Sequence, residues 1–150
     1  MALGTNSSRP HQMGDHHLSL LRIKSASDIG MSAKAGNATT TSSWIPCAGY
    51  NQATLLGTFT ADGSATSANI TFKIEVSNDE STAYPLQSAS TSSGVATLSD
   101  IVYTKATGNA STTFAIDFPL NYKFFRIKDF AIASGASGET YSVEVNLGKI

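Results

Sequence analysis

The stretch Asn69-Ile-Thr-Phe-Lys-Ile-Glu-Val76 decides the fold class of this 150-residue chain. Apolar side chains occupy every second position in it: Ile70, Phe72, Ile74 and Val76. Polar residues fill the positions between them. Because successive side chains of a strand point to opposite faces, this period of two predicts a half-buried antiparallel strand.

Four further segments alternate in the same way between clusters of Gly, Ser, Thr, Asn and Asp: Ala53–Thr60, Thr112–Phe118, Tyr122–Ile132 and Thr140–Leu147. Residues 97–104 predict a weaker strand. Within the third segment the apolar positions change phase, and a β-bulge near Lys128-Asp129 would restore the register. No window of ten or more residues has helical period. Seven or eight short strands predict an all-β fold, an antiparallel β-sandwich of jelly-roll or Ig-like type.

The first 43 residues differ in composition from the rest. They hold all three histidines, and residues 25–43 are a low-complexity run rich in Ser, Thr, Gly and Asn. Such segments are typical of extended chain and linkers. The remaining 107 residues, 44 to 150, suit one sandwich domain, since such domains have about 100 residues. We therefore predict an extended N-terminal arm and linker over 1–43 and a β-sandwich domain over 44–150.

Composition restricts the partners. Charged residues make up 14% of the chain and the net charge is −1, so the clustered Lys and Arg of a nucleic-acid-binding surface are missing. The uncharged run before Asp62 is too rich in Ser, Thr and Asn to cross a membrane. Cys47 is the single cysteine, which excludes an internal disulfide. The first residues contain no apolar stretch of signal-peptide length, and we expect assembly in a reducing cytoplasm.

No set of residues indicates catalysis, a cofactor or a metal. The predicted domain contains no histidine, so a Ser-His pair would need one from the arm. His11, His16 and His17 beside Asp15 form the only metal-like cluster, and their polar surroundings favour solvated side chains over convergent ligands. Four acids are the candidates for paired carboxylates, but residues in turns usually serve the turn: Asp79, Glu80, Asp100 and Asp117. We predict a protein that is not an enzyme.

Aromatic residues near strand ends leave a carbohydrate-binding sandwich open as the alternative. Such modules stack sugar rings on exposed aromatic side chains, although aromatic residues in these places more often form the border of a core. The candidates for stacking are Trp44, Tyr50, Tyr84, Tyr103 and Tyr122.

Three segments carry a resemblance to a known group of proteins: Gly57–Asp79 with its Phe72-Lys-Ile-Glu-Val-Ser-Asn-Asp79 strand, Phe124-Phe-Arg-Ile-Lys128, and Tyr141-Ser-Val-Glu-Val-Asn-Leu147. Over residues 57–147 the chain resembles the small β-sandwich virion accessory proteins of tailed bacteriophages. Those proteins often end a strand in Ser-x-Asp-Gly, and here Glu80 stands in place of that glycine. The Ser-x-Asp feature also occurs in discoidin-like carbohydrate-binding sandwiches.

The resemblance implies a non-enzymatic structural component of a bacteriophage particle. It would be a capsid decoration or cement protein that staples neighbouring shell subunits, or a neck or tail accessory protein. Its partners would be capsid or tail proteins and further copies of itself, and its location the virion. An extended arm can add a strand to an exposed sheet edge, and the segment expected to do so is Leu18, Leu20, Leu21, Arg22, Ile23 and Lys24. Equally, this segment could be the first strand of its own sandwich.

Overall fold

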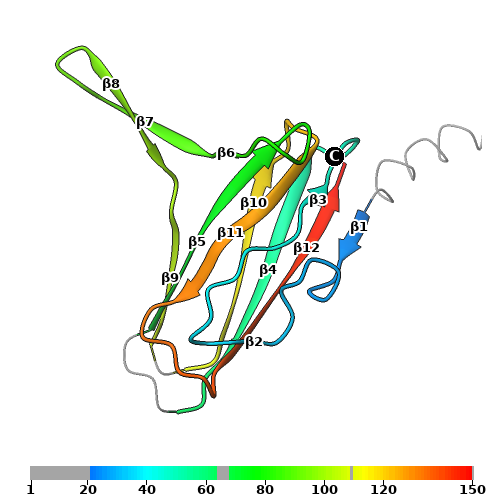
Figure 1. The fold of residues 1–150 in the computed structure, drawn as a ribbon, viewed down its shortest axis with the longest axis vertical. Helices are drawn as coiled ribbons and strands as arrows, with labels where there is room; N and C mark the ends of the chain where they lie inside the picture. Colours follow the sequence, from blue (N-terminus) through cyan, green and yellow to red (C-terminus); the bar gives the residue numbers. More distant parts are fainter. Residues whose placement is uncertain (1–20, 64–67, 109, 150) are drawn as a thin grey trace, which may run out of the picture.

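The computed structural model describes residues 21–63, 68–108 and 110–149. These residues form two antiparallel sheets of five strands each, packed face to face, and a separate two-stranded hairpin (Figure 1). The buried apolar side chains of the two sheets make one core. The predicted all-β sandwich is confirmed.

The first sheet has the strand order β1, β12, β4, β10, and a short strand β2 also pairs with β12. The bounds of these strands are β1 (Leu21–Lys24), β2 (Lys34–Ala35), β4 (Gln52–Thr60), β10 (Thr112–Pro119) and β12 (Thr140–Gly148).

The second sheet has the order β3, β11, β5, β6, and β9 also pairs with β5. Its strands are β3 (Ile45–Pro46), β5 (Ala68–Ser77), β6 (Tyr84–Pro85), β9 (Tyr103–Gly108) and β11 (Phe124–Ile132). The hairpin consists of β7 (Gln87–Ser92) and β8 (Val95–Asp100).

The alternating segments bury the face that their period of two predicts. In β5 the side chains of Ile70, Phe72 and Ile74 are at most 3% exposed. In β12 every second residue is buried, namely Tyr141, Val143, Val145 and Leu147. Each of these two strands is central in its sheet. Burial of one face of a central strand is the main stabilising term of such a sandwich.

The predicted β-bulge is present in β11. Its pairing with β5 shifts between Lys128 and Ala131, and Asp129 adopts a φ of 50°. The extra residue returns Phe130 to the inner face, where it is fully buried. The Asp129 N–H donates to Thr41 Oγ1 at 3.2 Å, so the bulge is hydrogen-bonded from outside the sheet.

Phe130 lies at the centre of an aromatic group that joins the two sheets. Its ring centroid is 5.5 Å from that of Phe72 in its own sheet. It is 4.7 Å from Tyr141 and 6.3 Å from Phe114 in the opposite sheet. The Tyr141 hydroxyl donates to Thr40 Oγ1 at 2.7 Å, so the one polar atom of the group is satisfied.

Residues 25–46 cover one side of the sandwich. Ile29 and Met31, which lie in the predicted linker, are 2% and 0% exposed and belong to the core. Thr40 forms an isolated bridge with Phe130, and the Ser42 N–H donates to the Ile127 carbonyl at 2.9 Å. The segment is thus packed on the body, while the division at residue 44 stays a prediction.

One predicted strand is wrong. Residues 97–104 do not form a single strand, because Asp100 ends β8 and Tyr103 begins β9. The two strands belong to different sheets. The Ser- and Thr-rich residues before them, which carry no clean apolar alternation, form the other half of the hairpin.

We expect Phe130→Ala to lower the free energy of unfolding by about 3–5 kcal/mol, because it empties the centre of the core. Urea denaturation followed by tryptophan fluorescence checks this. Thr113→Ala, an exposed change in β10, is the control and should stay within about 0.5 kcal/mol of the wild type. Equal losses for both variants would contradict the central role of Phe130.

Candidate functional site

The hairpin leaves the body from the middle of a sheet edge. On that edge of β5, β6 pairs with Glu75 and Val76, and β9 pairs with Ala68 to Phe72. Lys73 and Ile74 lie between the two partners. The chain departs there as β7 and returns as β8, and Figure 1 shows the hairpin projecting away from both sheets. It is therefore an insertion between two short edge strands.

The local sequence explains why these residues form a hairpin. Ser93 and Gly94 connect the strands and have φ values of 50° and 78°. Two consecutive residues with positive φ make the type I′ turn that suits the twist of paired strands. The pairing runs without interruption from Ser92↔Val95 to Gln87↔Asp100. Ser93-Gly94 between two runs of equal length is the sequence signal for this hairpin, and the strand predicted over residues 97–104 overlooks it.

Polar contacts fix the base of the hairpin. Lys73 Nζ lies 3.0 Å from Asp100 Oδ2, and Gln87 Nε2 donates to Asp100 Oδ1 at 3.0 Å. The Leu86 N–H donates to the Ile74 carbonyl at 3.0 Å. The hydrogen bonds from Lys73 and then Gln87 hold the pKa of Asp100 below its usual value of 3.8. The same contact with Asp100 raises the pKa of Lys73.

Beyond its base the hairpin is covered by nothing in the described structure. All twelve residues of β7 and β8 are exposed, and neither strand pairs with another sheet. Val95 and Leu98 are 65% and 63% exposed. A two-stranded hairpin alone is marginally stable in water. A contact with another macromolecule would bury these side chains and stabilise it.

The segment predicted to bind partners lies partly in the body. Leu21–Lys24 form β1, which pairs with β12 of the same chain from Leu21↔Gly148 to Lys24↔Val145. This is the second of the two alternatives for the segment. Leu18 and Leu20 lie outside the described residues, so their part of the prediction stays open.

β1 nevertheless presents apolar side chains outward. Leu21 and Ile23 are 59% and 58% exposed. Ile23 pairs with Asn146, so it lies on the outer face of the sheet, opposite the face that buries Leu147. Among the described residues, β1 is also the last strand of its sheet.

A second opening lies on the side of the sandwich where β9 and β10 are neighbours. A cavity of about 190 Å³ is lined there by Phe72, Tyr103, Thr104, Lys105, Phe114, Ala115 and Ile116. The Phe72 and Tyr103 rings stack at 5.1 Å. The Phe114 ring packs over Gly57 of β4, where any Cβ would collide with it. Phe114 and Ile116 are only half-buried, so this side of the core is not sealed.

The acids weighed for catalysis each have a local contact or a place in a turn. Asp79 accepts from the N–H groups of Thr82 at 2.8 Å and Ser81 at 2.9 Å, and these bonds lower its pKa. Asp100 binds Lys73, and Asp117 accepts from the Thr54 hydroxyl. Their arrangement is that of turn and surface carboxylates.

Glu80, the fourth acid, lies in the turn that follows β5. It has a φ of 62°, the left-handed conformation that glycine adopts most readily. Residues with a side chain adopt this conformation less often than glycine does.

The metal-ligating and thiol side chains of the described residues lie apart from one another or are buried. Among residues 21–63, 68–108 and 110–149, no three His, Cys, Asp or Glu side chains are grouped to hold a metal ion. His11, His16, His17 and Asp15 lie outside these ranges. Cys47 is fully buried, and burial raises the pKa of its thiol to about 11. The described part of the chain also contains no helix with the length and hydropathy to span a membrane.

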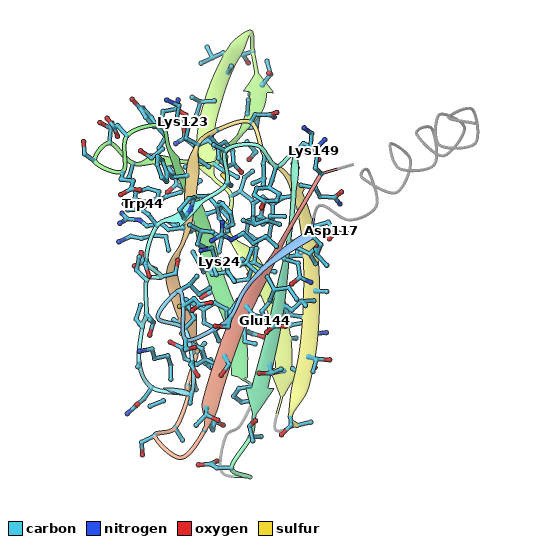
Figure 2. All side chains as sticks on the ribbon, turned by 90° about the vertical axis from the view of Figure 1, so that its right-hand side faces the viewer. Lys24, Trp44, Asp117, Lys123, Glu144 and Lys149 are labelled. Carbon is cyan, nitrogen blue, oxygen red and sulfur yellow. The ribbon has the colours of Figure 1, made fainter. Side chains whose placement is uncertain are left out.

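The aromatic side chains do not gather into one exposed platform. Arg126 lies 4.4 Å above the Trp44 ring and is itself paired with Glu75 at 2.6 Å. Tyr103 is stacked on Phe72. Tyr84 is the most exposed of the candidates, at 56%. Trp44 and Asp117 lie on opposite sides of the body (Figure 2).

Among the described residues the chain is a β-sandwich, and four of its six large exposed apolar side chains lie on a projecting hairpin and an edge strand. No family model matches the chain, and no curated protein matches it either. Among solved structures, the chain is similar to one described as "PRD1 vertex protein P5". The identity is 15%, the match covers 87% of this chain and 95% of that one, and the TM-score is 0.38.

We expect Asp100→Asn to loosen the hairpin and leave the body unchanged, because it removes the charge that Lys73 binds. Near neutral pH, amide hydrogen exchange of β7 and β8 should become several-fold faster than in the wild type. A carboxyl whose pKa is lower in the folded state stabilises that state at pH values above its usual pKa of 3.8. This stabilisation is lost as the pH falls. The difference should therefore shrink in acid.

Asp117→Asn is the matched control, since it removes an exposed carboxylate from β10. It should leave hairpin exchange unaltered. Equal hairpin protection in Asp100→Asn and wild type near neutral pH would show that the ion pair does not hold the hairpin.

Proposed function

We propose that this protein is a non-enzymatic structural component of a bacteriophage particle. It would serve as a capsid decoration or cement protein that staples neighbouring shell subunits, or as a neck or tail accessory protein. One observation carries the proposal: the exposed large apolar side chains lie mainly on two elements at the margins of the body. They are Leu21 and Ile23 on β1, and Val95 and Leu98 on the hairpin.

The placement of these elements suits a bridging role. In Figure 1, β1 and the hairpin lie on opposite sides of the sandwich. A copy that binds through both contacts two neighbours at once. Each contact buries apolar surface only in the assembled state, so binding stabilises the assembly by mass action. The rigid sandwich between them fixes their separation.

The surface chemistry supports contact rather than catalysis. The Asp79 and Asp100 carboxylates are held by hydrogen bonds that serve a turn and the hairpin base, whereas general acid–base catalysis needs groups aimed at a substrate. The charged fraction of 14% favours close packing over long-range electrostatic attraction. The bacteriophage assignment itself rests on the sequence resemblance of residues 57–147.

The number of copies in purified virus particles from the source of the chain tests the proposal. Quantitative mass spectrometry against the major capsid protein measures it. Hundreds of copies would identify a shell decoration protein, and a few to a few dozen would place the protein at the neck, tail or a vertex. Absence from the particles would overturn the virion role and favour the carbohydrate-binding alternative.

A variant in β1 tests the predicted binding segment. We expect Leu21→Ser with Ile23→Ser to reduce incorporation when variant and wild-type chains compete for the same particles, because the outward apolar pair is lost. Burial of two such side chains contributes about 3 kcal/mol or more, so the wild type should dominate strongly. Ser27→Ala, an exposed change just after β1, is the control. Equal incorporation of all three chains would exclude β1 from the contact.

A further inference from the structure

The two sides of the sandwich differ in how their core is covered. On one side residues 25–46 run across the body and contribute Ile29, Met31 and Ile45 to the core. On the other side, within the described residues, β9 and β10 end their sheets without a covering segment. The half-buried Phe114 and Ile116 of β10 lie there beside the 190 Å³ cavity. On this side the edge of β10 and the apolar residues beside it are thus uncovered within the described residues.

The size and lining of the cavity specify what would fill it. Five of its lining residues are apolar or aromatic: Phe72, Tyr103, Phe114, Ala115 and Ile116. An apolar cavity of about 150 Å³ can hold a benzene-sized molecule, so this one has room for an aliphatic side chain. β10 has an unpaired edge that ends in Pro119, and the seven residues before this proline can form backbone hydrogen bonds with an added strand. A strand with one projecting aliphatic residue would therefore fit the opening and the edge of β10.

The hairpin of the same protein contains a strand with one projecting aliphatic residue. β8 carries Leu98 between the small or polar residues Ala96 and Asp100 on one face. Leu98 pairs with Ala89 of β7, so nothing larger stands beside it on that face.

The hairpin also lacks the devices that keep exposed strands from pairing with others. Natural edge strands are protected by lysine, proline or a bulge. Apart from Asp100, which Lys73 binds at the base, β7 and β8 contain no charged residue, and they have neither proline nor a bulge. β1 by contrast carries Arg22 and Lys24, and β9 carries Lys105. The strands of the hairpin are thus suited to strand addition.

The hairpin cannot fill the opening of its own chain, since the contact of Asp100 with Lys73 fixes a base from which it projects away from the body (Figure 1). We propose that β8 of one copy adds to the free edge of β10 in a second copy and places Leu98 in the opening beside Phe114 and Ile116. The contact is heterologous: each copy offers its hairpin and receives another. Repetition then gives a ring or an open chain of copies.

Charge is compatible with this contact. Lys105 lines the opening, and the hairpin strands bring no Lys or Arg toward it. The single charged residue of the hairpin strands, Asp100, is engaged at the base by Lys73. The contact therefore meets no like-charge repulsion from these strands.

Cysteine cross-linking between copies tests the proposal. Thr97 and Ala115 are exposed, and each lies on the strand face opposite the apolar residues that would meet. A mixture of Thr97→Cys and Ala115→Cys chains, treated with a short bifunctional thiol reagent, should give a cross-linked pair that contains one of each. Neither variant alone should cross-link, because the contact joins two different surfaces. The wild type is the blank, since Cys47 is buried.

Two outcomes would overturn the proposal. Cross-linking of Thr97→Cys with itself would show that two hairpins pair with each other instead. No cross-link in the mixture would show that β8 and β10 do not meet. Thr97→Cys mixed with Ser27→Cys, whose residue 27 lies on the covered side, controls for random collision and should give no product.

A second variant measures the role of Leu98. In sedimentation at high protein concentration, Leu98→Ser should weaken self-association roughly tenfold or more, because one buried aliphatic side chain is lost. Thr97→Ser on the other face should not weaken it. Equal association of both variants would also overturn the proposal. Contacts between copies can be measured without a virion. A negative result in these experiments would overturn the contact between β8 and β10, whereas absence from purified particles would overturn the virion role.

Discussion

The stacking of Phe130 against rings from both sheets is the contact on which the rest of the fold depends. The ring lies between Phe72 and Tyr141, and it reaches the inner face only because the bulge at Asp129 adds one residue to β11. Without the bulge, the alternation of the strand would send Phe130 to solvent. A local backbone irregularity therefore determines how the two sheets meet.

The same aromatic group reaches both sides of the sandwich, and the two sides end differently. On one side the hydroxyl of Tyr141 binds Thr40, which holds the covering segment 25–46 in place. On the other side the group ends in Phe114 and Tyr103, which no described segment covers. One core thus has a closed side and an open side, because residues 25–46 cover only one of the two sides within the described part of the chain.

The strands that pack in the core could be predicted from sequence, and the surfaces that carry the proposed function could not. β5 and β12 bury one face each, so their alternation is complete, and the change of phase before Phe130 located the bulge. The hairpin buries neither face, so its sequence needs no apolar alternation. Its sequence signal is the Ser93-Gly94 turn. Ile29 and Met31 are isolated apolar residues in a polar run, and their burial depends on tertiary contacts that no local period records.

The open side and the hairpin form a contact of modest size, and this size has a consequence for assembly. One added strand and one leucine bury far less than the roughly 1,200–2,000 Å² of a stable interface. Free copies would then associate weakly. Copies held side by side on a particle through β1 would have a high effective concentration, which strengthens a weak contact without any new interaction. Attachment through β1 and linkage through the hairpin would therefore reinforce each other on the particle surface.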